Sequence, residues 1–228
     1  QSVYNSYKDN PKQFVDRINS YGLNKPLGLP IKGEGVPVIP QPGTNRWSGV
    51  ALPWMAFGYG LSVTPLQTLT LYNAVANDGV MVKPIFVSEI KEWNKTIKKF
   101  NTEVINPKIC SQETLDKVQA VLENVVKKGT GSKLYSKDFS MAGKTGTAQV
   151  NYKDKSKLYY ASSFVGYFPA DEPKYSCIIV VHKPNVAAGY YGADVAGPVF
   201  KRIAQKIFTD SPSTNHVKNI DAKVVSQE

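Results

Sequence analysis

The sequence predicts a mixed fold in which helices pack on an antiparallel sheet, an α/β protein of the α+β type. Three observations lead to this prediction. Capped helical segments occupy parts of the first half, three strand-like segments follow one another after Gly131, and an apolar helical stripe follows Pro198. Consecutive strands with short links pair antiparallel, because parallel strands need a crossover of a dozen residues or more.

Size and composition describe a folded chain with a basic surface. The 228 residues are 42% hydrophobic and 20% charged, which is enough apolar content for a core. The net charge of +10 favours anionic partners such as nucleic acid, anionic lipid or an acidic polymer. The basic residues are spread along the chain and match no nucleic-acid-binding motif. An ordinary solvated surface is therefore the simplest interpretation, and we expect no nucleic acid as partner.

Thiol and metal chemistry are disfavoured. Two cysteines, Cys110 and Cys177, cannot form a disulfide framework or a cysteine zinc cluster. The two histidines, His182 and His216, are far apart in the sequence, which argues against a histidine metal site. We expect neither a metal nor a cofactor. No apolar run reaches the length needed to cross a bilayer.

The first helix is predicted by its start and stop signals. Asn10 is a candidate N-cap, Pro11 fits the first turn, and Gln13 completes a capping box. Gly22 ends the helix. The segment 23–53 is rich in proline and glycine and predicts a long irregular stretch, of the kind that often lines a functional site.

Two further helices carry similar signals. Thr64 and Gln67 form a second capping box, and their helix runs to about Asn77, where an Asn-Asp-Gly turn stops it. Ser111 caps a third helix that ends at Gly129.

Strands are predicted between and after these helices. The segment 85–90 and the stretch around Ile97 predict a small hairpin. Longer strands, rich in β-branched and aromatic residues, are predicted at 141–150, 161–168 and 175–182. The last helix has an apolar stripe to lie on that sheet, formed by Val199, Ile203 and Ile207.

The sharpest chemical signal is the run 143–147, with the sequence Gly-Lys-Thr-Gly-Thr. A phosphate-binding loop also ends in Gly-Lys-Thr, but it needs a glycine where this chain has Asp138. It also needs a helix after the lysine, whereas β-type residues follow here. The run therefore favours the Lys-Thr-Gly strand of a serine acyl-transferase.

The residues of this strand suit the recognition of a peptide carboxylate. Lys144 places positive charge at the start of an edge strand, where it can attract a carboxylate. Thr145 and Thr147 lie two apart, so their hydroxyls share one face and can bind the same group. Gly146 lets a peptide pair with the edge, and the N–H of Thr147 is a candidate oxyanion donor. Alone, these five residues are more typical of an ordinary exposed strand.

Further segments resemble class B penicillin-binding proteins, in the order of that family. They are the glycine-rich turn and helix 58–67 with 76–79, the Lys-Gly-Thr-Gly stretch 128–131, the strand 143–149, the next strand 164–170, and the entry to a C-terminal helix at 191–200. The resemblance covers most of the chain, from about Tyr7 to Ile207, and is strongest to the cell-division type. It implies part of the β-lactamase/transpeptidase-like fold.

The resemblance implies a peptidoglycan D,D-transpeptidase that cross-links stem peptides by serine acyl transfer and is acylated by β-lactam antibiotics. It also implies a periplasmic place at the outer face of the cytoplasmic membrane and partners in the division complex. On the family pattern, Lys144 and Thr147 are catalytic. The substrate-binding strand consists of Lys144, Thr145, Gly146 and Thr147.

The chain departs from the family at two motifs, the nucleophile element Ser-x-x-Lys and the element Ser-x-Asn. The only Ser-x-x-Lys, at 88–91, lies in a predicted strand where the two side chains face opposite sides. The only Ser-x-Asn, at 213–215, lies in a polar tail. We interpret both as chance matches. We therefore expect 1–210 to be the C-terminal part of a transpeptidase domain, inactive alone, and 211–228 to be a tail. The nucleophile and a transmembrane anchor would precede Gln1.

Two alternatives stay open. A β-lactamase or carboxypeptidase of the same fold is disfavoured, because 58–79 and 164–170 resemble biosynthetic transpeptidases. A non-catalytic module that binds cell-wall polymer or a division partner fits the missing serine and the basic charge.

Four tyrosines could line a substrate groove, but tyrosines beside strand ends more often pack with a wet hydroxyl, so we leave them out of the site. They are Tyr159, Tyr160, Tyr190 and Tyr191.

Overall fold

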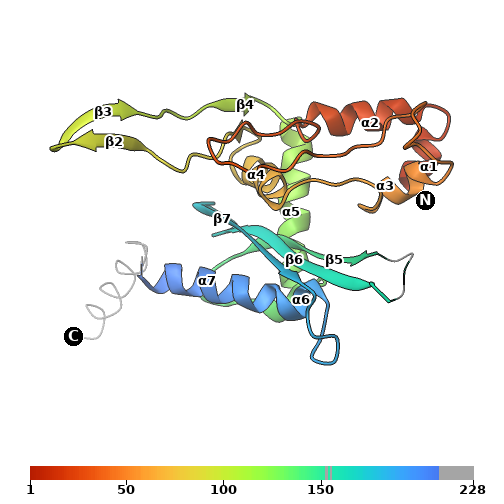
Figure 1. The fold of residues 1–228 in the computed structure, drawn as a ribbon. Helices are drawn as coiled ribbons and strands as arrows, with labels where there is room; N and C mark the ends of the chain where they lie inside the picture. The colour runs from red at the N-terminus through yellow and green to blue at the C-terminus, as the bar shows by residue number, and fades with distance from the viewer. Residues whose placement is uncertain (152–153, 155, 211–228) are drawn as a thin grey trace. The chain divides into compact units, whose positions relative to one another are not determined.

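The computed structural model describes residues 1–151, 154 and 156–210, drawn in colour in Figure 1. The tail 211–228 and its Ser-x-Asn triplet therefore lie outside the described residues. The chain divides into two compact units, an N-terminal unit Gln1–Val121 and a C-terminal unit that begins at Leu122. Among the described residues, none of the helices is long and apolar enough to span a membrane.

The first helices of the N-terminal unit are α1 (Ser2–Tyr7) and α2 (Pro11–Ser20). Pro11 begins α2, and Gly22, at φ +77°, follows its end as predicted. The predicted capping box is wrong. The Asn10 side chain makes no cap hydrogen bond, and the Gln13 N–H instead donates to the Asn10 carbonyl at 3.2 Å. Asn10 has φ −144° and ψ 73°, which is not the extended conformation typical of a capping residue.

The predicted irregular segment is largely confirmed. Between residues 23 and 50 the only regular pairing described is an isolated bridge from Val38 to Ser62. The segment ends slightly earlier than predicted, because α3 (Ala51–Met55) includes Pro53 in its first turn, where proline is tolerated. The Glu34 carboxylate accepts the N–H groups of Leu27 and Leu29 and so fixes the loop internally.

Helix α4 (Pro65–Ala76) confirms its predicted capping box. The Gln67 N–H donates to Thr64 Oγ1 at 3.1 Å, and the Thr64 N–H donates to Gln67 Oε1 at 2.9 Å. The Gln67 side chain is fully buried, and its Nε2 donates to the Lys25 carbonyl at 2.7 Å. The helix stops where predicted, with positive φ at Asp78 and Gly79.

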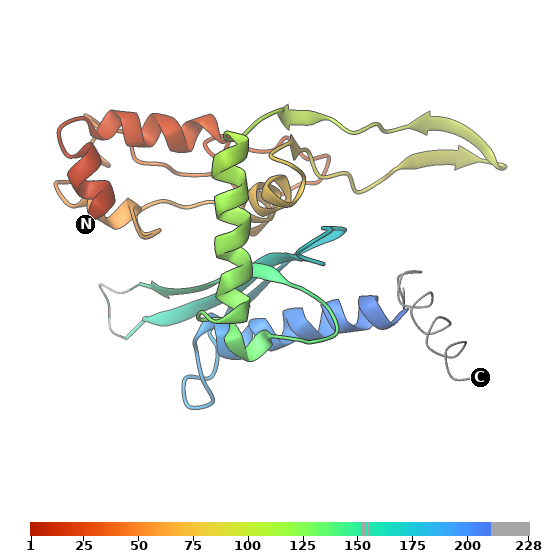
Figure 2. The same ribbon diagram turned by 180° about the vertical axis from the view of Figure 1, so that it is seen from behind.

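A β-hairpin extends from the N-terminal unit in Figures 1 and 2. Its strands β2 (Glu89–Glu92) and β3 (Lys95–Lys99) pair antiparallel, beyond a shorter pair formed by β1 (Met81–Val82) and β4 (Val104–Asn106). The predicted hairpin is confirmed, but its first strand begins at Glu89, not at residue 85. The half-exposed apolar residues 85–87 belong to no strand, so their β propensity alone does not make one.

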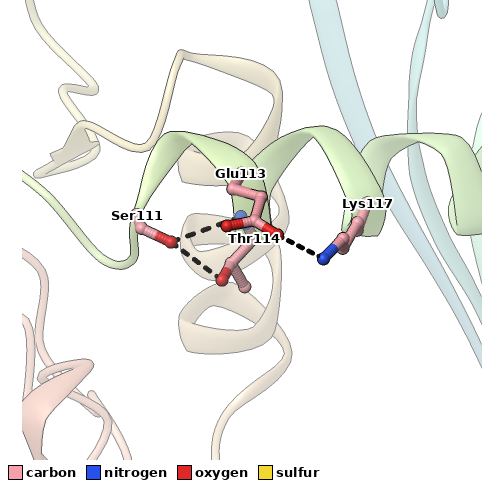
Figure 3. Close-up of polar contacts among 4 residues, drawn as sticks. All are labelled: Ser111, Glu113, Thr114 and Lys117. Atoms are coloured by element: carbon pink, nitrogen blue, oxygen red, sulfur yellow. Dashed lines mark hydrogen bonds and ion pairs between the residues drawn. The ribbon is translucent and has the colours of Figure 1, made fainter.

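Helix α5 (Gln112–Lys127) is capped by Ser111, as Figure 3 shows. The Thr114 N–H donates to Ser111 Oγ at 3.3 Å, and the two hydroxyls lie 2.9 Å apart. One turn further, Lys117 and Glu113 form an ion pair at 2.6 Å. The helix ends as predicted, and the Gly129 N–H donates to the Asn124 and Val125 carbonyls.

The C-terminal unit confirms the predicted antiparallel meander of three strands. Its strands are β5 (Ala142–Val150), β6 (Tyr159–Phe168) and β7 (Tyr175–His182), in the order β5-β6-β7. Its short helices are η1 (Ser132–Leu134) and α6 (Gly192–Val195), and the longer α7 (Gly197–Asp210) packs on the sheet. Phe200 of α7 is fully buried, with its ring 4.7 Å from that of Phe164 and 5.6 Å from that of Phe168. This aromatic contact anchors α7 to β6 and fixes the sheet that carries the run 143–147.

We predict that Thr64→Ala lowers the free energy of unfolding by about 1 kcal/mol, because the Gln67 N–H loses its cap. Urea unfolding measures this change. The control is Thr102→Ala, an exposed threonine outside any helix or strand, which should change little. Equal losses in the two variants would contradict a capping role.

Candidate active site

The run 143–147 forms the first half of β5, at the edge of the described three-stranded sheet. Strand, not helix, follows Lys144, which rejects the phosphate-loop alternative. Lys144 is exposed, and the next three residues are half-buried. In register with β6, Thr145 lies opposite Phe164, Gly146 opposite Ser163, and Thr147 opposite Ser162.

Lys144 and Thr145 form a small polar cluster with Thr130. Lys144 Nζ donates to the Thr145 carbonyl at 2.8 Å and lies 3.5 Å from Thr145 Oγ1. The hydroxyls of Thr145 and Thr130 lie 3.1 Å apart. Thr130 belongs to the loop between α5 and η1, where the Gly131 N–H donates to the Val125 carbonyl at 2.9 Å. We did not assign a role to Thr130 from sequence, although the stretch 128–131 was a signal for it.

Thr147 connects β5 to the start of α6. Its Oγ1 accepts the Gly192 N–H at 3.0 Å. The two threonine hydroxyls, expected to share one partner, thus contact different groups of the protein: Thr130 for Thr145, and Gly192 for Thr147. Each hydroxyl has spare hydrogen-bonding capacity, since a hydroxyl can donate once and accept twice.

Close packing leaves little room for a side chain at three glycines of this region: backbone approaches Gly192 and Gly143, and the Ser163 side chain approaches Gly146. A methyl group at Gly192 would lie 2.3 Å from the Ser163 carbonyl oxygen and 2.5 Å from that of Gly146. One at Gly146 would lie 2.5 Å from Ser163 Oγ, and one at Gly143 would lie 2.6 Å from the Val165 carbonyl oxygen. The sequence suggested only that Gly146 gives clearance to a substrate. The structure adds that Gly146 also gives clearance to β6.

Of the tyrosines that we left out of the site, Tyr159 and Tyr160 begin β6, and Tyr190 and Tyr191 directly precede Gly192. The rings of Tyr160 and Tyr190 stack at 4.2 Å, and the rings of Tyr190 and Tyr191 lie 4.5 Å apart. A hydrogen bond with the Tyr191 hydroxyl at 3.2 Å, followed by the charge of that neighbour, raises the pKa of Tyr190 to about 12. Ser162 Oγ donates to the Tyr190 carbonyl, which holds this segment against β6.

Two cavities of the C-terminal unit lie away from Lys144. One, of about 360 Å³, lies between η1 and the helices α6 and α7, where Lys133 pairs with Asp194 at 2.8 Å. The other, of about 590 Å³, lies at the far end of β5 and β6, next to Tyr159 and Lys183. Lys144 lines neither cavity, so a substrate groove beside it stays a prediction.

The Ser-x-x-Lys at 88–91 lacks the helical geometry of a nucleophile site. Ser88 is exposed and precedes β2, and Lys91 lies within that strand. Lys91 Nζ pairs with Glu89 at 2.7 Å. The serine and lysine do not share a helix face, in agreement with our interpretation of a chance match.

A scan against protein families matches residues 4–205 to the penicillin-binding protein transpeptidase domain. The chain belongs to this family. Its structural neighbours are transpeptidase domains with the transpeptidase/β-lactamase-like fold, which confirms the predicted fold class.

Curated members of the penicillin-binding family resemble the chain over most of its length. It is 32% identical over 199 residues to the peptidoglycan D,D-transpeptidase FtsI of Buchnera aphidicola, covering 86% of this chain and 33% of the relative. It is 31% identical over 191 residues to FtsI of Escherichia coli K12, covering 83% of this chain and 30% of the relative. The chain thus spans about a third of the length of these relatives.

Solved structures of penicillin-binding proteins resemble the chain as well. Apo penicillin-binding protein 3 of Mycobacterium tuberculosis superposes with a TM-score of 0.76 at 28% identity, covering 90% of this chain and 47% of that one. The apo transpeptidase domain of penicillin-binding protein 3 from Burkholderia pseudomallei gives 0.71 at 26% identity, covering 89% and 58%.

We predict that Gly192→Ala destabilises the C-terminal unit by about 1–3 kcal/mol, because the new methyl group overlaps backbone atoms of β5 and β6. The amide resonance of Gly146 should shift in the same variant. Thermal unfolding and two-dimensional NMR measure the two effects. Gly49→Ala is the matched control, since a methyl group there meets nothing within 4 Å. A stable Gly192→Ala variant with unshifted resonances would contradict this packing.

We also predict a pH-dependent effect of Ser140→Ala just before β5. Ser140 Oγ donates to the Asp171 carboxylate, and this bond is the main cause that lowers the Asp171 pKa. A folded pKa below the unfolded value of about 3.9 adds stability above that pH, which is lost as the pH falls through the folded pKa.

In Ser140→Ala, the Asp171 pKa should therefore rise, as measured by NMR titration. The stability difference from wild type should be present at pH 7 and shrink below about pH 4. An Asp171→Asn background is the control, because it should remove the pH dependence. A pH-independent difference in both backgrounds would contradict this assignment.

Proposed function

We propose that residues 1–210 are the C-terminal part of the transpeptidase domain of a peptidoglycan D,D-transpeptidase, which cross-links stem peptides in cell-wall synthesis and division. The family membership and the names of the relatives support this proposal. The observation that carries it is the sheet edge β5, where the Lys144 ammonium lies beside the Thr145 hydroxyl on an exposed strand.

In the proposed complex, the stem peptide pairs with the outer edge of β5 as an added strand. The terminal carboxylate lies against Lys144 and Thr145. Lys144 exchanges its hydrogen bond to the neutral Thr145 carbonyl for one to the carboxylate, which is stronger because both donor and acceptor are then charged.

The hydroxyl contacts leave both threonines able to donate a hydrogen bond to an anion. Thr147 Oγ1 accepts the Gly192 N–H, so its own proton stays able to point at a carboxylate. Thr145 Oγ1 can accept from both Lys144 and Thr130, with the same result. Both residues therefore suit an anionic ligand better than a neutral one.

Acyl transfer needs a nucleophile and an oxyanion site. We propose that the Thr147 backbone N–H stabilises the negative charge on the carbonyl oxygen of the tetrahedral intermediate. The attacking serine and its lysine would come from a Ser-x-x-Lys element outside this sequence. The role of Lys144 is then electrostatic: its charge holds the substrate and favours the anionic forms of nearby groups.

We propose β-lactams as inhibitors that use the same carboxylate site. Penicillin-binding protein 3 of Mycobacterium tuberculosis, a structural neighbour, has been solved in complex with aztreonam. By the same analogy with FtsI, we propose that the protein acts at the outer face of the cytoplasmic membrane with division-complex partners and a membrane anchor.

We predict that this chain alone forms no covalent adduct with benzylpenicillin, because its one Ser-x-x-Lys, at 88–91, does not place the serine and the lysine on one face of a helix. Intact mass spectrometry after incubation measures the adduct. Escherichia coli FtsI is the positive control for acylation. A mass increase of one penicillin on this chain would contradict the prediction and reveal a different nucleophile.

The second candidate is a non-catalytic module that binds cell-wall polymer or a division partner. The net charge of +10 favours it, because a basic surface attracts an anionic polymer without a catalytic serine. The two functions differ at Lys144. A peptide site depends on this one ammonium, whereas a general basic surface does not.

We predict that Lys144→Ala weakens binding of a peptide ending in D-alanyl-D-alanine by about tenfold or more, because a charge-assisted hydrogen bond is lost. NMR titration measures the affinity, and the largest shifts should fall on residues 144–148. Lys12→Ala is the matched control, since Lys12 is an exposed lysine that pairs with Asp16 in its own helix. Equal weakening in both variants would favour the general basic surface.

A further inference from the structure

The hairpin of β2 and β3 ends in a tip, residues 92–95, that exposes a single large aromatic side chain. Trp93 is 97% exposed, more than any other large hydrophobic residue described. Tryptophan side chains are usually largely buried, because the ring carries the largest apolar area of any side chain. A tryptophan held this far in solvent is available to a partner.

The backbone conformation at Trp93 also costs conformational free energy. Trp93 has φ +46° and Asn94 has φ +67°, the left-handed conformations of a two-residue hairpin turn. Asparagine tolerates this region, but a bulky residue such as tryptophan is an outlier there. The turn would form more easily with glycine or asparagine at position 93. The tryptophan therefore brings no conformational advantage that explains its place.

The hairpin that carries Trp93 is rich in lysine. The hairpin 89–100 contains four lysines and two glutamates, for a net charge of +2. Glu89 is already engaged, by Lys91 at 2.7 Å and by the Thr96 hydroxyl at 3.0 Å. Lys95 and Lys98 lie along β3, and both are exposed. The tip thus combines one flat apolar surface with cationic groups.

This composition argues for one kind of partner. Lysine is depleted in protein–protein interfaces, whereas tryptophan is enriched, so four lysines do not suit a protein partner. A bilayer is disfavoured because the tip would carry Glu92 and Lys95 toward the hydrocarbon with the ring. A glycan with carboxylate side groups fits both features. Its sugar rings present flat C–H faces to an aromatic ring, and its carboxylates attract lysines.

We propose that the tip of the hairpin, together with β3 as far as Lys98, is a second docking site for peptidoglycan, separate from the strand edge β5. Trp93 stacks on a sugar ring of the glycan, and Lys95 and Lys98 bind carboxylates of the stem peptides. The identity of the polymer rests on the proposed function. The site would hold the cross-linked wall, while β5 binds one stem-peptide end.

The test is co-sedimentation of the chain with purified insoluble peptidoglycan at low and at physiological salt. Trp93→Ala should raise the apparent Kd about fivefold or more, and Trp93→Tyr should restore most of the binding. Val36→Ala, at a residue that is 73% exposed, is the control and should bind as wild type. Near-complete exposure of Trp93 means that the fold should survive, which circular dichroism checks.

The charge component has its own variants. Lys95→Ala/Lys98→Ala should weaken binding most at low salt, because salt screens exposed charges. Lys32→Ala/Lys108→Ala removes the same charge elsewhere and should weaken binding less. Equal loss in the two double variants would overturn the role of the hairpin lysines.

Three further outcomes decide the rest. If Trp93→Ala sediments like Val36→Ala, the docking site is refuted. If anionic phospholipid vesicles retain the chain through Trp93 and peptidoglycan does not, the partner is a membrane and the proposal fails. If Trp93-dependent sedimentation persists while Lys144→Ala leaves stem-peptide binding unchanged, the docking site stands and the peptide site on β5 fails instead.

Discussion

The rest of the site depends on one close backbone contact. The backbone of Gly192, at the start of α6, lies directly against the backbone of Gly146 in β5 and of Ser163 in β6. A single methyl group at Gly192 would come within 2.5 Å of carbonyl oxygens on both β5 and β6. This close approach brings the Gly192 N–H to Thr147 Oγ1, and it orders the segment that carries Tyr190 and Tyr191. The contact of Thr147 with Gly192 thus depends on the lack of a side chain at Gly192, because a methyl group there would push α6 away from β5.

This packing also decides how the threonine hydroxyls of β5 can use their hydrogen atoms. A hydroxyl that accepts from the protein keeps its own hydrogen for a ligand, and both Thr145 and Thr147 have donors beside them. Lys144 adds positive charge at the exposed end of the same strand. In the proposed function, these groups favour an anion before any ligand arrives, which lowers the reorganisation that binding requires.

Local signals predicted local structure well and tertiary contacts poorly. Thr64 and Gln67 formed their capping box, whereas Asn10 and Gln13 did not, because the backbone at Asn10 departs from the extended conformation of a capping residue. The three-strand meander and the strand after Lys144 followed from residue type and spacing. The contact of Thr130 with Thr145 did not, since it joins positions 15 apart through a loop geometry that no periodicity encodes.

The side chain of Gln67 has a consequence for how the N-terminal unit opens. One buried amide caps α4 with its oxygen and holds the Lys25 carbonyl with its nitrogen. If the proline-rich loop moves away, Gln67 Nε2 loses its acceptor. If the start of α4 frays, the Lys25 carbonyl loses its donor. Two segments 42 positions apart thus share one opening event, so protection against amide exchange should be spread evenly across them.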